Sequence, residues 1–392
     1  MHLKNNPLRL SLNMSYCKSS GLIRSLLVIF FYCMALITMA LANWPLFRGS
    51  PDMRGVSDEA IQLPLKLSWT VQIGQGVIAT PVIADSRVYI GTEEGRFVCL
   101  DLSTGDILWE YKAEDTIQGA ACVMRDAVAF GSGDGILQCL SASSGKLNWK
   151  YETEGEILAG ANLYHSEKDQ ADYVLIGSYD NYLHCVNLAT GKAKWKYETE
   201  NYVNGAAGVH EGNIYFGGCD AQIYCIDAET GKVGVSMDAE NYIANSIVVS
   251  DNVAYVAHHG NRVAAFDLTE KKRLWEFGER DFPFLASPAV TKDSVYSAGK
   301  DKRLYRINRS TGKGIWEFKT GSGIESSPVV SGSSVLVGSG DGNLYSVDIN
   351  TGKEQWSYDI GDSIRSSPAI SEGKVVIGCD DGKIYAFSTK RR

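Results

Sequence analysis

The sequence predicts an all-β fold, an eight-bladed β-propeller whose last blade is closed by the N-terminal strand. Three observations predict it: tryptophans recur about every 40 residues, tight-turn residues separate short apolar segments, and one repeat is divided between the two ends of the chain. A period near 40 residues without a helical pattern is typical of propellers and solenoids. A closed ring explains the divided repeat, because pairing the two ends removes an exposed sheet edge, whereas a solenoid would not need to divide a repeat.

Tryptophans mark the repeats. The interval between Trp195 and Trp275 contains one further copy, in which Val235 takes the tryptophan position. Burial of an indole covers about 150–250 Å², so we interpret these side chains as structural contacts between neighbouring blades. The alternative, stacking on a sugar or a quinone, would require them to face the channel. The tryptophans assigned to blade docking are Trp69, Trp109, Trp149, Trp195, Trp275, Trp316 and Trp356.

Each copy contains four short strands, as residues 323–360 illustrate. "GIESSPVVS" and "SSVLVGSG" are the first two, and "NLYSVD" and "EQWSYDI" are the third and fourth. Asp-Gly and Thr-Gly-Lys join them, since hairpin turns need residues that reach positive φ. The third copy contains an insertion, "YHSEKDQADY", that we interpret as a solvated loop.

The two ends of the chain complete each other. The last copy contains only the first three strands of a repeat. The first tryptophan strand, at 65–73, corresponds to a fourth strand, and no first three strands precede it. The N-terminal strand is therefore predicted to be the fourth strand of the last blade. We assign residues 66–392 to the propeller and residues 43–65 to a segment that wraps it.

Residues 1–42 resemble a secretory signal peptide. Lys4, Arg9, Lys18 and Arg24 precede an apolar run, and "ALA" at 40–42 follows it. The alternative is an uncleaved membrane anchor, because the run is only slightly shorter than a membrane span. With cleavage we expect a periplasmic or secreted monomer that has no stable membrane insertion.

The charge of the chain excludes some classes of partner. Residues 1–42 hold four of the 38 basic residues and none of the 46 acidic ones, so the remaining chain carries a net charge of −12. Such a balance argues against nucleic acid or anionic lipid as a partner.

Cysteines and histidines offer no reactive site. Cys99, Cys139, Cys185 and Cys225 occupy the same position in four copies, too far apart for the ~7 Å limit between bridged Cα atoms, so we expect them in the core. His258 and His259 are adjacent on a strand and should point to opposite faces. "GSGDG" at 131–135 and 338–342 precedes no helix that could bind phosphate. We predict no enzyme, no cofactor and no metal.

One end of the channel is the candidate interaction site. Aligned on their first strands, the copies place at one rim position Ile78, Gln118, Leu158, Asn204, Ala244, Leu285, Glu325 and Arg365. Aromatic residues precede this position in three consecutive copies, and aromatic and arginine side chains are enriched in interfaces. The alternative is ordinary packing of the rim. The predicted protein-interaction rim comprises Tyr202, Tyr242, Phe282, Phe284, Glu325 and Arg365.

The Thr-Gly-Lys phrase followed by tryptophan resembles the PQQ-like, or quinoprotein-type, propeller repeat, whose tryptophan-docking motif packs blades together. The leader "NWPLFRGSPDMRGVSDE" resembles the segment that wraps the rings of this family. One branch of the family oxidises alcohols or sugars with PQQ and calcium. A second branch contains BamB-like exported propellers of outer-membrane assembly, without known catalysis.

The residues favour the second branch. The chain has no pair of adjacent cysteines, which alcohol-oxidising members use to stack the quinone, and its copies lack long insertions. Cys33 follows Tyr32 rather than the small residues of a lipid-attachment signal, so we expect a protein without a lipid anchor. The resemblance implies a non-catalytic scaffold for a protein partner of the cell envelope; the alternative is a PQQ-dependent oxidoreductase or a degenerate relative that binds a quinone or sugar.

Overall fold

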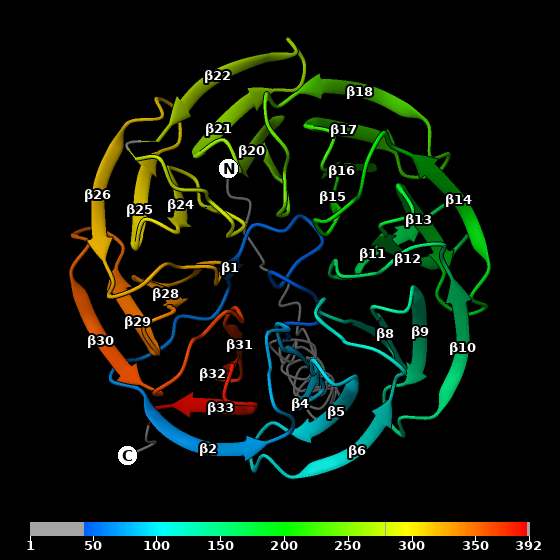
Figure 1. The fold of residues 1–392 in the computed structure, drawn as a ribbon, viewed down its shortest axis with the longest axis horizontal. Helices are drawn as coiled ribbons and strands as arrows, with labels where there is room; N and C mark the ends of the chain where they lie inside the picture. Colours follow the sequence, from blue (N-terminus) through cyan, green and yellow to red (C-terminus); the bar gives the residue numbers. More distant parts are fainter. Residues whose placement is uncertain (1–42, 279, 390–392) are drawn as a thin grey trace, which may run out of the picture. The chain divides into compact units, whose positions relative to one another are not determined.

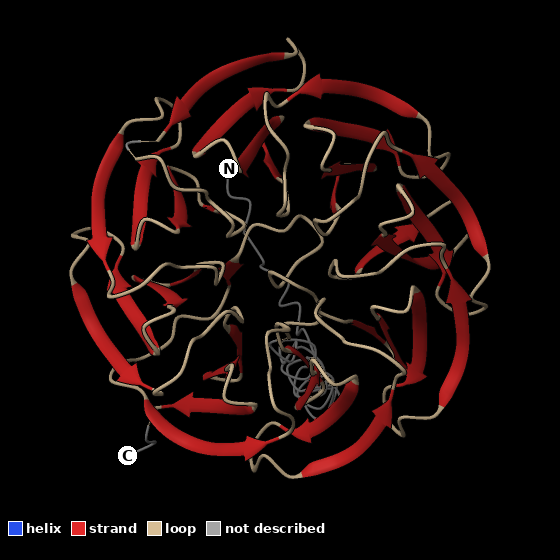
Figure 2. Ribbon diagram, in the orientation of Figure 1, coloured by secondary structure: helices blue, strands red, loops and turns tan. Residues whose placement is uncertain are grey.

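Eight antiparallel sheets surround a central channel in the computed structural model, which describes residues 43–278 and 280–389 (Figures 1 and 2). We number the sheets as blades 1 to 8 in chain order. All described elements are strands and turns, and no helix among these residues has the length and apolarity that crossing a bilayer requires. The predicted all-β, eight-bladed propeller is confirmed. The predicted signal peptide lies outside the described residues.

Each blade has four strands of the ring, ordered from the channel to the outer edge, and blade 7 gains β1 as a fifth strand. Blades 1 to 4 comprise β3 (Val82–Ala84), β4 (Arg87–Gly91), β5 (Arg96–Asp101) and β6 (Ile107–Lys112); β7 (Cys122–Met124), β8 (Ala127–Gly131), β9 (Ile136–Ser141) and β10 (Leu147–Glu152); β11 (Asn162–Ser166), β12 (Ala171–Gly177), β13 (Tyr182–Asn187) and β14 (Ala193–Glu198); β15 (Gly208–His210), β16 (Asn213–Gly217), β17 (Gln222–Asp227) and β18 (Val233–Asp238).

Blades 5 to 8 comprise β19 (Val248–Ser250), β20 (Val253–His258), β21 (Arg262–Asp267) and β22 (Lys272–Phe277); β23 (Ala289–Val290), β24 (Ser294–Gly299), β25 (Arg303–Asn308) and β26 (Gly314–Lys319); β27 (Val329–Ser331), β28 (Ser334–Gly338), β29 (Asn343–Asp348) and β30 (Glu354–Asp359), with β1 (Val56–Ser57); and β31 (Ala369–Ser371), β32 (Lys374–Gly378), β33 (Lys383–Ser388) and β2 (Lys66–Gln72).

The last blade contains both ends of the described chain. Strand β2 pairs antiparallel with β33, with Thr70 opposite Tyr385 and Gln72 opposite Lys383. In Figure 1 the blue β2 lies outside the red β33 at the bottom of the ring. The predicted closure by the N-terminal strand is confirmed, and it covers the edge that β33 would otherwise expose.

The core lies between blades, because both faces of a middle strand are covered. In β5 and β9 the four central residues are buried, whereas the outer strand β6 alternates between exposed and half-buried residues. The cysteines follow this pattern: Cys99, Cys139, Cys185 and Cys225 are free and buried. The sequence-based expectation for these four residues is confirmed.

The tryptophans of the outer strands contact the following blade. Trp109 donates from its indole N–H to Ala142 O at 3.0 Å, and its ring covers Gly145, where an added Cβ would lie 2.6 Å from the indole. Gly145 also has φ of +70°, a conformation that favours glycine. The same indole–carbonyl bond links Trp69 to Leu102, Trp149 to Leu188, Trp195 to Ala228, Trp275 to Arg309 and Trp316 to Ile349.

Where the indole is missing, the glycine is missing too. Val235 occupies the tryptophan position of blade 4, and the turn of blade 5 that follows it contains Lys271 in place of the glycine. Lys271 adopts φ of 53°, so the turn keeps its shape with a side chain present. The turn itself therefore accepts a side chain, and the glycine is required where an indole packs against the turn.

The N-terminal segment predicted to wrap the ring runs across its middle, where it appears as the blue loop of Figure 1. Its backbone bonds in turn to the inner strands of several blades, and β1 pairs in parallel with β27. The segment therefore links the inner edges of the blades across the channel. These bonds join Trp44 to Ile83, Pro45 to Val123, Pro51 to Val209, Arg54 to Val290 and Gly55 to Val330.

Arg48 anchors this segment. Its side chain is only 1% exposed, and its guanidinium donates to Pro328 O at 2.8 Å and Pro288 O at 2.9 Å. Burial lowers the pKa of Arg48 to about 9. Two carbonyls from blades 6 and 7 thus fix the segment at the centre of the ring.

We expect Trp195→Ala to lower the free energy of unfolding by about 3–5 kcal/mol, because it removes a large ring that packs on Gly231. Val235→Ala is the matched control at the equivalent position of the next blade and should cost about 1–3 kcal/mol. Chemical denaturation of both variants measures the difference. Negligible losses in both would contradict a structural role for the tryptophans.

We expect deletion of residues 43–73 to cause aggregation or loss of cooperative unfolding, because it removes β2 and exposes the edge of β33. Deletion of residues 43–60 retains β2 and should have the milder effect. Size-exclusion chromatography and thermal melting distinguish the two proteins. A monomeric product of the longer deletion with an unchanged melting temperature would show that closure through β2 is dispensable.

Candidate functional site

Eight loops, each leading from the outer strand of one blade to the inner strand of the next, meet at one end of the channel. Of the eight rim positions aligned from the sequence, seven line one cavity there, with a volume of about 190 Å³. We call this end the mouth. Phe47 of the N-terminal segment also lines the cavity. The residues from the aligned position are Gln118, Leu158, Asn204, Ala244, Leu285, Glu325 and Arg365.

Backbone-to-hydroxyl bonds tie the blades together around the cavity. The N–H of one blade donates to a serine or threonine hydroxyl of the next. Blades 2, 3 and 4 have Ala120, Gly160 and Ala206 at this position, and Phe47 packs there instead. These hydroxyl groups therefore hold neighbouring blades together. The bonds run from Ala206 to Ser246 (3.1 Å), Ser246 to Ser287 (3.0 Å), Ser287 to Ser327 (3.0 Å), Ser327 to Ser367 (2.9 Å) and Ser367 to Thr80 (3.2 Å).

The two predicted rim charges are held by neighbouring side chains. Glu325 accepts a bond from Lys300. Arg365 donates to Asp380 at 2.7 Å and lies 3.6 Å from Glu93. Burial raises the pKa of Asp380, and Arg365 only partly offsets this effect. Both rim charges therefore line the cavity as members of ion pairs.

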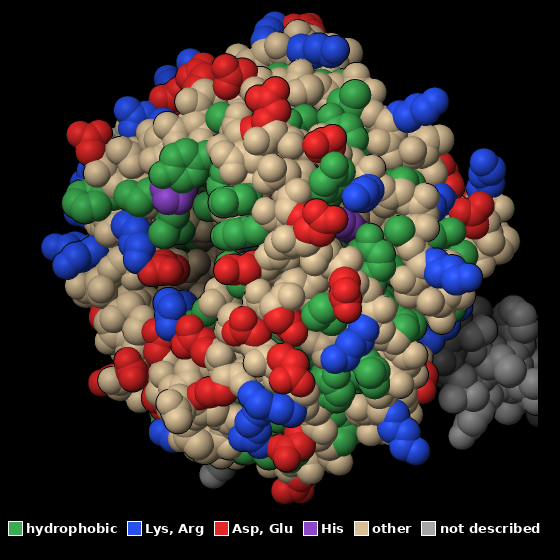
Figure 3. All heavy atoms as spheres, turned by 45° about the vertical axis from the view of Figure 1, so that its right-hand side comes forward, with side chains coloured by type: hydrophobic (Ala, Val, Ile, Leu, Met, Phe, Trp, Pro, Cys, Tyr) green, Lys and Arg blue, Asp and Glu red, His purple; other side chains and the backbone are tan. Residues whose placement is uncertain are grey.

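Three predicted aromatic residues are exposed at the mouth. Tyr202 and Tyr242 are each 44% exposed, and Phe282 is 50% exposed. Tyr202 stacks on Tyr179 with ring centroids 4.5 Å apart, and Tyr242 stacks on His259 at 4.2 Å. In Figure 3, which views the molecule obliquely, hydrophobic side chains and a histidine lie above a hollow, and acidic side chains lie below it.

The prediction for Phe284 is wrong. Its side chain is 2% exposed and packs on Tyr305, with ring centroids 5.9 Å apart, so it belongs to the core. Phe284 occupies the position that is Ile or Val in the other seven copies, such as Ile117 and Ile157, which are fully buried. Comparison of the copies at this position could have shown that Phe284 fills the core.

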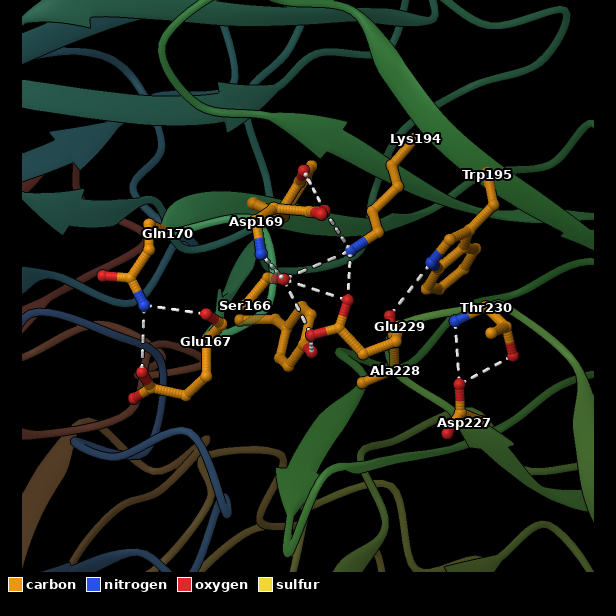
Figure 4. Close-up of polar contacts among 12 residues, drawn as sticks. Ser166, Glu167, Asp169, Gln170, Lys194, Trp195, Asp227, Ala228, Glu229 and Thr230 are labelled. Carbon is orange, nitrogen blue, oxygen red and sulfur yellow. Dashed lines mark hydrogen bonds and ion pairs between the residues drawn. The ribbon is translucent and has the colours of Figure 1, made fainter.

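A second polar cluster joins blades 3 and 4 (Figure 4). Lys194 of β14 lies 2.7 Å from Asp169 and 2.6 Å from Glu229, and Ser166 donates to Glu229 at 2.7 Å. Ser166 and Asp169 come from the insertion that the sequence analysis interpreted as a solvated loop. That interpretation is wrong for Ser166, which is fully buried, because it ends β11, pairs with Ala171 of β12 and bonds to Glu229 of the next blade.

This cluster does not support serine–lysine chemistry, although Lys194 Nζ lies 3.5 Å from Ser166 Oγ. A general base would need an uncharged lysine at its working pH. Burial lowers the pKa of Lys194, but its bonds to Asp169 and Glu229 outweigh burial, and the pKa is raised overall. Lys194 therefore remains a cation, and the cluster is a contact between blades.

The histidine pair has separate surroundings. His258 is 5% exposed and accepts a hydrogen bond from Gly260 N on Nδ1, whereas His259 stacks on Tyr242. Burial lowers the pKa of both imidazoles. Within the described part of the chain, no three His, Cys, Asp or Glu side chains gather as a metal ion would require.

The ring of tryptophan-bearing sheets, with a cavity at one end, defines a β-propeller of the quinoprotein-like class. The chain matches the family described as "Outer membrane protein assembly factor BamB" over residues 65–204, 180–287 and 272–391. The protein belongs to this family.

Solved structures share the fold. BamB from Moraxella catarrhalis superposes with a TM-score of 0.69 at 19% identity, covering 84% of this chain and 99% of that one. Quinohemoprotein alcohol dehydrogenase from Comamonas testosteroni gives a TM-score of 0.75 at 15% identity, covering 91% and 83%. Propellers of both branches named by the sequence resemblance are therefore similar in fold.

A curated relative matches a short region. Quinoprotein ethanol dehydrogenase from Pseudomonas putida is 31% identical over 83 residues, which is 19% of this chain. The match spans 13% of the length of that enzyme. The similarity extends over about two of the repeats.

The residues at the mouth do not fit PQQ, the quinone cofactor that similarity to such dehydrogenases suggests. PQQ is a fused tricyclic tricarboxylate, whereas the cavity of about 190 Å³ is below the ~300–1,000 Å³ typical of small-molecule pockets. Phe47 shares the cavity, and Arg365, a cation that lines it, is already paired with Asp380 and Glu93. The cavity therefore offers PQQ neither the space nor an unpaired cation.

We expect the purified protein to show no binding of PQQ with Ca²⁺ at micromolar concentration, because the cavity is too small and its arginine is already paired. Absorbance spectra of PQQ titrated with protein, with and without Ca²⁺, measure binding. A stoichiometric, Ca²⁺-dependent spectral change, or dye reduction with ethanol or glucose, would contradict this expectation.

Glu229 should make stability depend on pH. Bonds from Lys194 and Tyr164 lower its pKa to about 2, against the opposing effect of burial. A carboxyl group whose pKa is lower in the folded than in the unfolded protein stabilises the fold at pH values above the pKa of the unfolded state. This contribution disappears as the pH falls through the folded-state pKa of about 2. We expect the difference in melting temperature between the wild type and Glu229→Gln to be largest above pH 5 and to shrink towards pH 2.

Glu114→Gln is the control for this pH series, since Glu114 is exposed and forms no ion pair with the described residues. Its melting curves should follow those of the wild type across the same range. A constant difference between wild type and Glu229→Gln at all pH values would contradict the role assigned to the Glu229 carboxylate.

Proposed function

We propose that this protein is an exported, non-catalytic scaffold that holds a partner protein of the cell envelope at the mouth of its channel. The observation that carries the proposal is the exposure of Tyr202, Tyr242 and Phe282 on three successive blades. Membership of the BamB family supports a role in the envelope. The apolar N-terminal run, followed by small residues, supports export to the periplasm or the medium.

The arrangement of these rings suits recognition. Tyrosine is enriched in the binding hot spots of protein interfaces. Stacking on Tyr179 and His259 restricts Tyr202 and Tyr242 before binding, so an interface would cost them little conformational entropy. Tyr202 and Tyr242 occupy equivalent positions in successive loops, and Phe282 directly precedes the equivalent residue of the next loop, Pro283, so the three aromatic residues follow one another around the mouth.

We expect the double variant Tyr202→Ser, Tyr242→Ser to lose its partner while keeping its melting temperature, because both rings are largely exposed. The partner is defined by cross-linking to residues of the mouth, identified by mass spectrometry, and then purified for affinity measurements. Leu108→Ser, Leu274→Ser is the matched control, since these side chains are 46% and 45% exposed on outer strands.

The two double variants separate the alternatives. Loss of affinity only in the tyrosine variant would support the proposed function. A large fall in melting temperature with intact binding would show that the tyrosines are ordinary rim packing, and the interaction rim would then be abandoned.

A further inference from the structure

We propose that the segment docking at the mouth is a basic, extended stretch of the partner protein, whose arginine or lysine side chains lie between Tyr202 and the carboxylates of blades 2 to 4. This inference rests on the proposed function and specifies the chemistry of the partner. Three observations carry it: the charge of the loops at the mouth, the pairing of those charges, and the position of the stacked tyrosines.

The loops at the mouth are strongly acidic. By sequence, the eight loops between outer and inner strands contain ten acidic residues and two basic ones. This excess accounts for most of the negative charge of the propeller. The acidic residues are Glu114, Asp115, Glu154, Glu156, Glu200, Glu240, Glu279, Asp281, Glu325 and Asp362, and the basic ones are Arg280 and Arg365.

Five exposed carboxylates without a counter-charge among the described residues lie together on one side of the mouth, whereas Asp281 and Asp362 lie singly on the loops that enter blades 6 and 8. On the other side, Glu325 pairs with Lys300, and Glu240 of blade 5 pairs with Arg273. The acidic side chains on the loops that enter blades 2 to 4 are exposed and form no ion pair with the described residues. These five are Glu114, Asp115, Glu154, Glu156 and Glu200.

The tyrosine stack borders these free carboxylates. Tyr179 donates its backbone N–H to Glu156 O at 2.9 Å, and Tyr202 stacks on its ring in a nearly parallel arrangement, with 2° between the planes. Burial raises the pKa of Tyr179, and the negative charge of Glu156 contributes to the rise. The carboxylate of Glu156 therefore lies within electrostatic reach of the stack.

Carboxylates beside an exposed aromatic face form a site for a cation. An ammonium or guanidinium group gains from the quadrupole of the ring, and a planar guanidinium can stack on the ring while it bonds to a carboxylate. An acidic partner would be repelled by the same loops. Because the carboxylates extend over three consecutive blades, several cations along one extended segment fit better than a single small cation.

The test uses a fluorescein-labelled nonapeptide of alternating arginine and serine, and the same peptide with neutral citrulline in place of arginine. Fluorescence anisotropy with the full chain measures binding of both probes. We expect the arginine peptide to bind and the citrulline peptide not to bind. Because exposed ion pairs are screened by salt, the affinity for the arginine peptide should fall steadily as NaCl is raised.

The triple variant Glu154→Gln, Glu156→Gln, Glu200→Gln should weaken binding of the arginine peptide by about tenfold, since three exposed ion pairs are lost. The control, Asp58→Asn, Glu211→Gln, Asp293→Asn, makes the same change in net charge at exposed positions outside the mouth loops. It should weaken binding by less than about twofold, because those sites lie away from the bound segment. All six carboxylates are surface groups, so the melting temperatures should stay unchanged.

Equal binding of both peptides, or equal weakening in the two triple variants, would overturn the inference. The proposed function is tested separately by its tyrosine variant. If the identified partner still needs Tyr202 and Tyr242 but binds the Glu154, Glu156 and Glu200 variant normally, the scaffold role stands and the basic segment is excluded. If the tyrosines are dispensable for the partner, the proposed function itself fails.

Discussion

Contact between an indole of one blade and a glycine turn of the next is the interaction on which the ring depends. Six of the seven docking indoles donate to a backbone carbonyl and pack against a turn glycine of the next blade. The contact therefore fixes both the distance and the rotation between successive sheets. Its repetition explains why blades of nearly equal length close after eight copies, with β2 supplying the final strand.

The junction between blades 4 and 5 shows how the contact constrains sequence. Val235 leaves space above the following turn, and Lys271 then replaces the glycine. Between blades 3 and 4 an additional cluster around Lys194 joins the sheets through charges. The ring thus tolerates the loss of one indole–glycine contact and the addition of a charged contact at another junction.

Closure of the ring also determines the properties of the mouth. Phe47 and the serine hydroxyls fill the centre of the channel, and they leave a cavity too small for a tricyclic cofactor. Surface chemistry is therefore concentrated in the surrounding loops, which carry free carboxylates and exposed tyrosines. These features favour binding of a macromolecular segment over chemistry inside the channel.

Repetition in the sequence was enough to determine the strand order, the blade number and the closure, because each copy repeats the same turns at a fixed period. Alignment of the copies also located seven residues of the cavity. The failures concern residues whose environment depends on other parts of the chain. Phe284, like Phe282, precedes the aligned rim position and is an aromatic residue, which predicts a place on the rim, but the equivalent residues of the other copies are in the core.

Only the tertiary structure decided where unique segments lie. The guanidinium of Arg48 is held by carbonyls 240 and 280 positions away, and Ser166, at the end of β11, is buried against Glu229 of the next blade. No local pattern indicates either contact, because both partners come from other blades. The sequence by itself determined the repeating architecture, since that depends on turns and periodicity within each copy. The plug of the channel and the free charges of its mouth depend on distances between blades, and these exist only once the ring has closed.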